Sequence, residues 1–157
     1  MTRWKLPPPA KVYEAFGAVA DGRVHATGPG SAEVRSSGRD RTYTVEWSAD
    51  LGTVTANDNA SYWQGYLGYP IVAVLLTLGV LRADERVVGQ LAGIRWHELN
   101  ARFKRDYDAA VDSVLTALAR QGADRARIEV EVAGVMAQLA TLELERTGRG
   151  RRPPKAD

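Results

Sequence analysis

Two stretches of the sequence decide the fold. They are Thr42-Tyr-Thr-Val-Glu-Trp47 and Ile71-Val-Ala-Val-Leu-Leu-Thr-Leu-Gly-Val-Leu81. The first alternates, with Tyr43, Val45 and Trp47 on one face and polar residues on the other, a pattern typical of a half-buried strand. The second is eleven residues long, too short for the roughly 20 residues that span a bilayer. We therefore expect a buried helix that lies across the apolar face of a sheet.

Shorter segments on both sides of the first stretch predict more strands. Gly28-Pro29-Gly30 and Asp50-Leu51-Gly52 have the composition of tight turns. Tight turns between short strands favour an antiparallel meander with one solvated face. A short helix precedes it, because Val12, Phe16 and Val19 share one helical face. The expected helix is Lys11–Ala20, and the further expected strands are Val24–Thr27, Ala32–Ser36 and Thr53–Ala56.

The second half of the chain is predicted to be helical. A short amphipathic turn at residues 87–91 is followed by apolar residues that recur every three or four positions over Trp96–Arg120. A second stripe follows Asp124, a typical N-cap, and extends to about Arg146. Two stripes with a short break predict a helical hairpin. The fold class is α+β: a short helix, a three- or four-stranded antiparallel sheet, a buried helix and a C-terminal helical hairpin.

Composition sets the outer limits on function. The chain has 157 residues, 45% hydrophobic and 25% charged, which suits one compact domain with a helical appendage. We expect a sheet domain at 1–83, a helical hairpin at 84–146 and a basic flexible tail at 147–157. Cysteine is absent and only two histidines occur, which excludes disulfides, iron–sulfur clusters and thiolate zinc sites. We expect no metal and no cofactor.

Charge and location follow from the same reading. The net charge of +2 is concentrated in the last eleven residues, which carry four basic residues and Asp157. This tail is either a solubilising terminus or a basic arm for phosphates or an acidic partner. Pro7, Pro8 and Pro9 interrupt any apolar signal-peptide core. We expect a cytoplasmic protein without membrane contact.

The region 31–81 resembles the SWIM zinc-finger family. Ser36-Ser37-Gly38 and Tyr43-Thr44-Val45 match the turn and strand that open the family pattern, and Ile71–Leu76 matches its apolar helix. The resemblance covers about a third of the chain and implies a ββα arrangement with a general association with nucleic-acid or protein binding. It does not imply metal binding here, because Asn57, Asn59, Gly68 and Pro70 fall near the four zinc-ligand positions.

The loop 57–69 is the most unusual segment, with four aromatic residues, three Asn or Asp residues and two glycines. Its amides and carboxylate can cross-link the loop in place of a metal. Its aromatic residues can form a small core, or they can stack on bases or sugars. With two arginines that follow in the chain, it supplies the candidate binding residues: Asn57, Asp58, Asn59, Tyr62, Trp63, Tyr66, Tyr69, Arg102 and Arg105.

Three functions are compatible with these residues. The first is a non-enzymatic binding module for a protein partner or for self-association, because the helical hairpin has more apolar surface than one small sheet covers. The second is nucleic-acid binding through the loop aromatics and the arginines. The third is an enzyme with carboxylates or Tyr and Asn groups in a pocket beside the loop. It ranks last, because the sequence offers no nucleophile–base pair.

Overall fold

The computed structural model describes residues 2–148 and 150–155, and it confirms the α+β class. A four-stranded antiparallel sheet has the strand order β2-β3-β4-β5, the predicted meander. Val45 of β4 pairs with Ala32 of β3 on one side and with Ala56 of β5 on the other. All three are buried, so the alternation in this part of the sequence creates one apolar face. The strands are β2 (Val24–Gly28), β3 (Ser31–Arg35), β4 (Thr42–Trp47) and β5 (Val54–Ala56).

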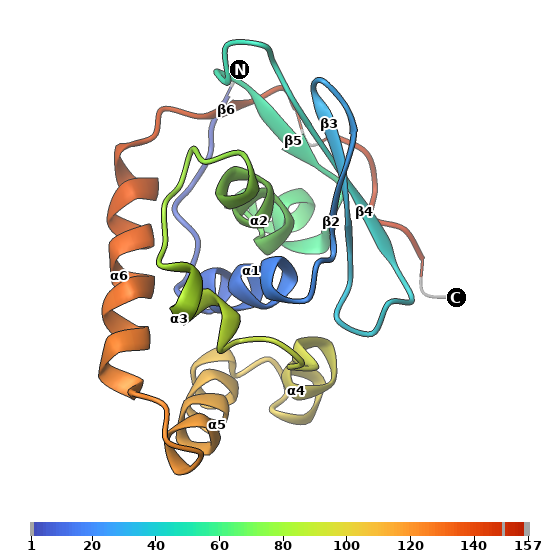
Figure 1. Ribbon diagram of the computed structural model, residues 1–157. Coiled ribbons are helices and arrows are strands. Elements are labelled where there is room, and N and C mark those ends of the chain that lie inside the picture. Colours follow the sequence, from blue (N-terminus) through green and yellow to red (C-terminus); the bar gives the residue numbers. More distant parts are fainter. Residues whose placement is uncertain (1, 149, 156–157) are drawn as a thin grey trace.

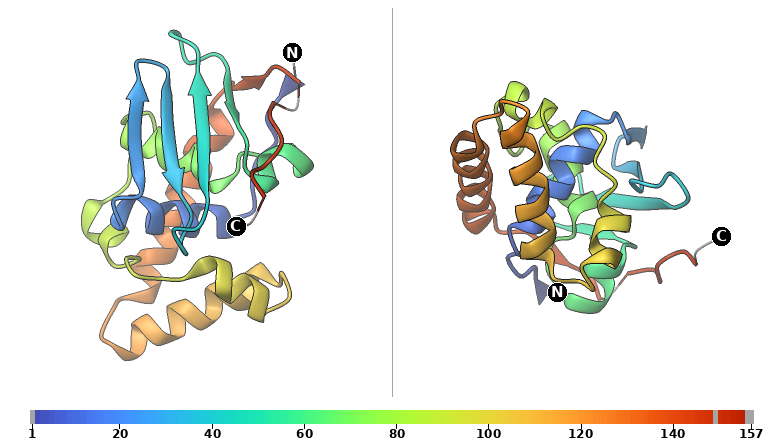
Figure 2. Two further views of the ribbon diagram at one scale, coloured as in Figure 1. Left: turned by 90° about the vertical axis from the view of Figure 1, so that its right-hand side faces the viewer. Right: turned by 90° about the horizontal axis from the view of Figure 1, so that it is seen from below.

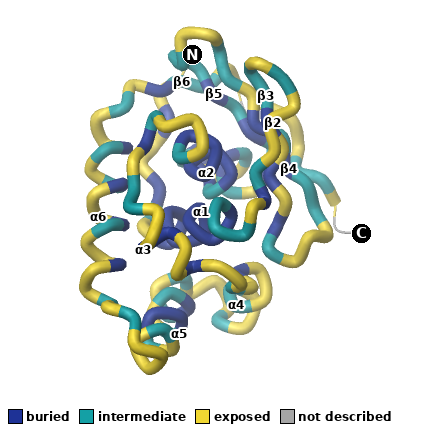
Figure 3. The backbone as a smooth tube through the Cα atoms, viewed as in Figure 1, coloured by how far each residue is buried: buried dark blue, intermediate teal, exposed yellow. Residues whose placement is uncertain are grey.

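Two helices pack against each other at the centre of the molecule, and the second of them lies on this apolar face of the sheet (Figure 1). They are α1 (Ala10–Ala20) and α2 (Tyr69–Thr77), and both are buried over most of their length (Figure 3). The position of α2 confirms the predicted buried helix, although it ends before the expected Leu81. The chain leaves the helix at Gly79, whose φ of 77° is the left-handed conformation that glycine adopts readily.

The expected continuous helix over Trp96–Arg120 is wrong. The structure has α4 (Trp96–Arg102) and α5 (Tyr107–Arg120), separated by a turn in which Lys104 and Arg105 have φ values of 52° and 65°. The Ala109 amide donates to the Asp106 carboxylate (3.1 Å), which makes Asp106 the N-cap of α5. The cap therefore begins a second helix, although the apolar stripe continues through this point in the sequence.

The last helix, α6 (Arg125–Thr141), also differs from the expectation, because it ends before Arg146. Residues Glu145–Arg146 instead form β6, which pairs antiparallel with β1 (Thr2–Arg3). The Trp4 amide donates to the Leu144 carbonyl (3.0 Å), and its indole Nε1 donates to the Val54 carbonyl (2.9 Å). The two ends of the chain therefore close the fold beside β5, a pairing that no local pattern reveals.

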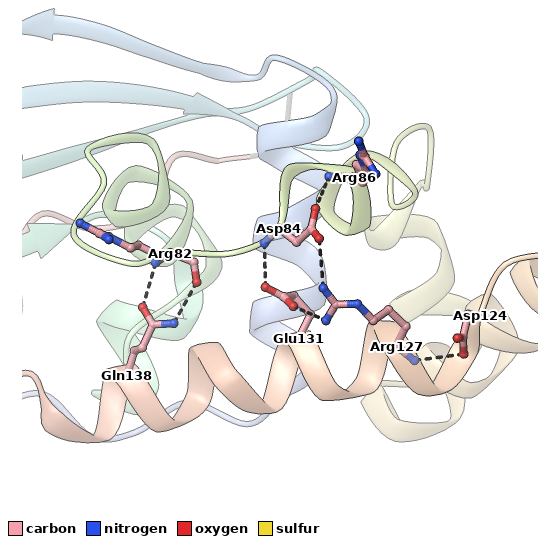
Figure 4. Close-up of polar contacts among 7 residues, drawn as sticks. All are labelled: Arg82, Asp84, Arg86, Asp124, Arg127, Glu131 and Gln138. Carbon is pink, nitrogen blue, oxygen red and sulfur yellow. Dashed lines mark hydrogen bonds and ion pairs between the residues drawn. The ribbon is translucent and has the colours of Figure 1, made fainter.

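The helix α6 is fastened to the segment that joins α2 to α3 (Glu85–Gly89) by a polar network (Figure 4). Gln138 exchanges two hydrogen bonds of 2.8 Å with the backbone of Arg82. Glu131 accepts from the Asp84 amide (2.7 Å), and Arg127 lies 3.0 Å from the Asp84 carboxylate and 2.8 Å from Glu131. We call these residues, 82, 84, 127, 131 and 138, the α6 network.

The apolar stripes of the helices are covered within the chain. Ile128, Val132, Val135 and Leu139 of α6 are at most 3% exposed and belong to the same apolar cluster as the sheet and α1. Among the described residues, the exposed large apolar side chains are Leu6, Trp63, Leu78 and Val130. Arg151 lines a small crevice with Thr44, Glu46 and Thr55, so the described tail reaches the outer sheet face. Arg149, Ala156 and Asp157 of the predicted tail lie outside the described residues.

Candidate functional site

A cleft of about 940 Å³ lies where α1, the ends of the sheet strands, the loop 57–69 and the α4–α5 segment meet. Figure 2 shows α4 and α5 as a layer beyond α1 and the sheet, and the cleft residues come from both parts. Its lining combines aromatic rings with polar and charged side chains. The lining includes the side chains of Lys11, Glu14, Asp58, Trp63, Trp96 and Arg105.

A buried ion pair forms the part of the cleft wall that belongs to α1. Lys11 Nζ lies 2.9 Å from Glu14 Oε2, and the two side chains are 8% and 7% exposed. Glu14 Oε1 accepts from Asn100 Nδ2 of α4 (3.0 Å), and Lys11 Nζ lies 4.4 Å from the centre of the Tyr107 ring. Burial lowers the pKa of Lys11, but the Glu14 charge and hydrogen bond and the nearby tyrosines outweigh it and raise the pKa overall. Lys11 is therefore a fixed cation.

Asp58 is the second buried carboxyl group in the cleft, 4% exposed. Its Oδ2 accepts from the Ser61 amide (3.1 Å), and Ser61 Oγ in turn accepts from the Gly68 amide (3.1 Å). Its Oδ1 has no hydrogen-bond partner within the described chain. Burial raises the pKa of Asp58, against the lowering effects of the Ser61 hydrogen bonds and the Lys11 charge. The group is thus held where ionisation is unfavourable.

Glycine is required at position 68 by this arrangement. A Cβ atom there would lie 2.0 Å from Asp58 Oδ2 and 2.8 Å from Ser61 Oγ. Both atoms belong to short side chains that are already fixed by hydrogen bonds, so neither can move away easily. Gly68 also precedes α2, and its carbonyl accepts from Val72 (3.2 Å). The carboxyl of Asp58 therefore packs directly against the start of the buried helix.

Tyrosine hydroxyls add neutral polar groups to the lining. Burial raises the pKa of Tyr43, Tyr66 and Tyr69, so all three stay protonated at neutral pH. Tyr43 and Tyr69 contact each other edge to face, with ring centres 6.2 Å apart. Protonated phenols donate and accept hydrogen bonds without adding charge. The cleft thus offers polar contacts that suit an uncharged part of a ligand.

Trp63 is the exposed aromatic residue of the cleft, with 56% of its surface accessible. It lies on η1 (Ala60–Gln64), a single turn of π-helix in the segment that has no helical periodicity in its sequence. The Tyr62 ring contacts the Trp63 ring edge to face, with ring centres 4.6 Å apart. Arg146 Nη1 donates to the Ser61 carbonyl (3.3 Å). Such π-turns occur often at functional sites. Trp63 is therefore presented to solvent on a supported turn.

Arg105 is a cation of the cleft whose side chain has no hydrogen bond or ion pair to the described chain. Its left-handed backbone, like that of Lys104 before it, is uncommon for residues with a side chain. The Arg105 amide donates to the Asn100 carbonyl (2.8 Å), which fixes the turn. Strained backbone of this kind is concentrated at binding sites. Arg105 is placed at the cleft with its charge uncommitted.

The structure brings six of the nine candidate residues to the cleft and leaves three outside its lining. Asn57 instead fastens the loop to the sheet, since its Oδ1 accepts from the Thr44 amide (2.8 Å). Tyr62 supports Trp63, and Arg102 is exposed on α4. Asn57 and Asp58 make the expected side-chain hydrogen bonds to backbone amides. The six residues of the cleft are Asp58, Asn59, Trp63, Tyr66, Tyr69 and Arg105.

The sequence reading missed Lys11, Glu14 and Trp96 as site residues. A signal was present for two of them, because Lys11 and Glu14 are the only charged residues of an otherwise apolar helix and are three positions apart. Trp96 carries no such signal. Its buried indole Nε1 has no acceptor in the described structure and lies over Gly17, where a Cβ atom would be 3.1 Å away.

Residues 2–148 and 150–155 contain neither a metal-binding cluster nor a membrane-spanning helix. Among these residues, no group of three or more His, Asp or Glu side chains is placed to hold a metal ion. None of the helices in this part of the chain is long and apolar enough to cross a bilayer.

Comparison with known proteins adds a family. The family model described as "Uncharacterised conserved protein UCP014422" matches residues 4–145. The chain belongs to this family. The match includes every cleft residue discussed above, from α1 to the α4–α5 turn. No curated protein and no solved structure matches the chain.

Proposed function

We propose that this member of the UCP014422 family is a binding module and that the cleft beside η1 takes a small molecule. The observation that carries the proposal is Asp58, a buried carboxyl group of the cleft, one oxygen of which has no hydrogen-bond partner in the part of the chain that the structure describes. Buried polar atoms of folded proteins are nearly always hydrogen-bonded, so an exception in a cavity points to a ligand.

The lining supports binding in preference to a purely structural role. The Lys11–Glu14 ion pair is held by Asn100 and Tyr107 on the other side of the cleft. A buried pair of this kind contributes little net stability, because removing two charges from water offsets their attraction. Polar groups kept at such a position favour a role in recognition.

The covered helical stripes weigh against the helices as the main contact surface. Self-association was expected because α5 and α6 have long apolar stripes, and these are buried against α1 and α3 within one chain. A protein partner remains compatible with Trp63 at the cleft mouth. The proposal therefore places recognition in the cleft.

A screen of small molecules by protein-observed NMR tests the proposal. The library contains neutral, cationic and anionic ring compounds, and the readout is the indole N–H signals of Trp63 and Trp96. We expect compounds that shift both signals and that lose this effect in Asp58→Asn. If the compounds shift Trp63 alone, or if none shifts either signal, the cleft is not a small-molecule site.

Single-stranded nucleic acid is a second candidate, favoured by the exposure of Trp63 in a cleft that Arg105 also lines. It predicts binding that weakens steeply with salt, because phosphate contacts release counterions. Salt-titrated binding of single-stranded DNA and RNA to the full chain and to Trp63→Ala tests it. Binding that does not respond to salt, or that is equal in the two proteins, would exclude it.

Two finer points also stay proposals. The resemblance of residues 31–81 to the SWIM family suggests a metal-free relative, supported by the hydrogen bonds of Asn57 and Asp58 to backbone amides. A cytoplasmic location is the second of these proposals.

A further inference from the structure

We infer that the ligand of the cleft is a planar ring that carries an anionic group, with the ring on Trp63 and the anion on Arg105. This inference rests on the proposed function, because it names the chemistry of the ligand for the same cleft. A nucleoside monophosphate and an aromatic carboxylate share this chemistry.

The charged side chains of the cleft indicate the charge of the ligand. Lys11, Arg23 and Arg105 face two carboxyl groups, Glu14 and Asp58. Lys11 is neutralised by Glu14 (2.9 Å), and Arg23 is 1% exposed and donates to Asp21 (3.2 Å) and to the Arg35 carbonyl (2.7 Å). Arg105 alone among these cations has no partner in the described structure. Arg105 is therefore the cation left for a ligand, and a guanidinium binds carboxylate or phosphate with two parallel hydrogen bonds.

The aromatic residues of the cleft indicate a ring in the ligand. Trp63 is exposed at the mouth of the cleft, and Tyr62 supports it edge to face. An exposed indole that is held in place offers a face on which a ring stacks, worth about 1–3 kcal/mol for a base on an aromatic side chain. Trp63 and Arg105 come from different segments, η1 and the α4–α5 turn, and both line one cleft. A ring that carries an anionic group has a partner for each of these two side chains.

Asp58 adds a hydrogen-bonding group to the cleft. Its unpartnered oxygen accepts a hydrogen bond when ionised, and the carboxyl donates one when protonated. Either state suits the edge of a nitrogen heterocycle, which carries both donors and acceptors. The tyrosine hydroxyls at the same wall add neutral partners for such an edge.

Calorimetric titration of the full chain with matched probes tests the inference. The first pair is indole-3-acetate and tryptamine, which share a ring and differ in the sign of the charge. The second pair is adenosine monophosphate and adenosine, and inorganic phosphate serves as the anion without a ring. We expect at least one anionic ring probe to bind tenfold or more tightly than its counterpart and than phosphate. The two pairs distinguish a carboxylate from a phosphate as the anion.

Variants assign the two contacts. Arg105→Gln should weaken the anionic probe at least tenfold, whereas Arg102→Gln, an exposed arginine outside the cleft lining, should leave its affinity unchanged. Trp63→Ala should weaken the anionic and the neutral ring probe alike. Far-UV circular dichroism of each variant verifies that it is folded.

Three results would overturn the inference. They are equal or tighter binding of tryptamine or adenosine, equal effects of Arg105→Gln and Arg102→Gln, and no binding of any probe. If these probes fail while neutral or cationic compounds shift Trp63 and Trp96 in the NMR screen, the ligand class is wrong and the proposed function stands. If the screen also fails, both are wrong.

Discussion

The α6 network and the cleft are both polar clusters that join distant parts of the chain, yet they differ in how completely their groups are paired. In the α6 network, Gln138 satisfies the amide and carbonyl of Arg82, and Glu131 satisfies the amide of Asp84. In the cleft, Asp58 Oδ1 and Trp96 Nε1 are buried and have no hydrogen-bond partner among the described residues. The partly exposed cluster is complete and the buried one is incomplete.

This contrast separates a structural cluster from a recognition site. The hydrogen bonds of the α6 network pair its polar groups with one another and hold α6 in place, so the network requires no ligand. Buried groups that stay unpaired destabilise the fold, and natural proteins tolerate such groups where function requires them. The difference predicts how substitutions in the two clusters change stability.

The largest expected effect comes from breaking the buried ion pair. Lys11→Met leaves Glu14 as an uncompensated buried charge and should lower the free energy of unfolding by about 3–5 kcal/mol. The double variant Lys11→Met/Glu14→Gln should recover most of this loss. The matched control is Arg127→Met in the α6 network, where an ion pair that is part exposed should account for about 1 kcal/mol or less. Urea unfolding measures all three, and equal losses in the single and double variants would contradict the prediction.

The next effect comes from the close packing at Gly68. Gly68→Ala should lower the free energy of unfolding by about 3 kcal/mol, because the added methyl group meets the Asp58 carboxyl. Gly134→Ala in α6 is the control, since nothing lies within 4 Å of its Cβ position and its φ is not left-handed. It should stabilise the protein by about 0.5–1 kcal/mol. Thermal unfolding in which both variants change in the same direction would show that Gly68 is not packed as described.

A smaller effect is expected in the α6 network. Gln138→Ala removes two hydrogen bonds to Arg82 and should lower the free energy of unfolding by about 1 kcal/mol. Gln121→Ala, an exposed glutamine after α5, should change it by less than about 0.5 kcal/mol. Denaturant unfolding compares them, and the network is unimportant if the two losses are the same.

The sheet and its covering helix were predictable because their patterns are local. The alternation of Tyr43, Val45 and Trp47 and the apolar run from Ile71 each determine which side is buried. The turn between α4 and α5 was not predictable, because Phe103 and Tyr107 are four positions apart and continue the helical spacing of apolar residues across the break. The pairing of β1 with β6 depends on contacts between the two ends of the chain, which no window of sequence contains.

The candidate site was predictable in part for the same reason. Asp58 and Trp63 stood out because the loop 57–69 is dense in aromatic and Asx residues, and Arg105 was a candidate as one of the arginines that follow the loop in the chain. Lys11 and Glu14 belong to a helix that reads as core, and their place in the cleft depends on how α4 and α5 pack against α1. Local sequence gives residue types, whereas the convergence of distant segments on one cleft is a tertiary property.

The most direct test of the account is the stability of Asp58→Asn as a function of pH. Since burial raises the pKa of Asp58 in the folded state, its contribution is favourable below the ordinary value of 3.8 and is lost as pH rises through the raised pKa. The amide oxygen of asparagine keeps the hydrogen bond from Ser61 and carries no charge.

Thermal unfolding of the wild type and Asp58→Asn between about pH 4 and pH 8 makes the measurement. The account predicts that the wild type loses stability relative to the variant as pH rises, so that the variant is the more stable protein at neutral pH. Parallel curves, or a variant that is less stable at every pH, would show that the carboxylate is part of the scaffold and contradict its assignment to a ligand.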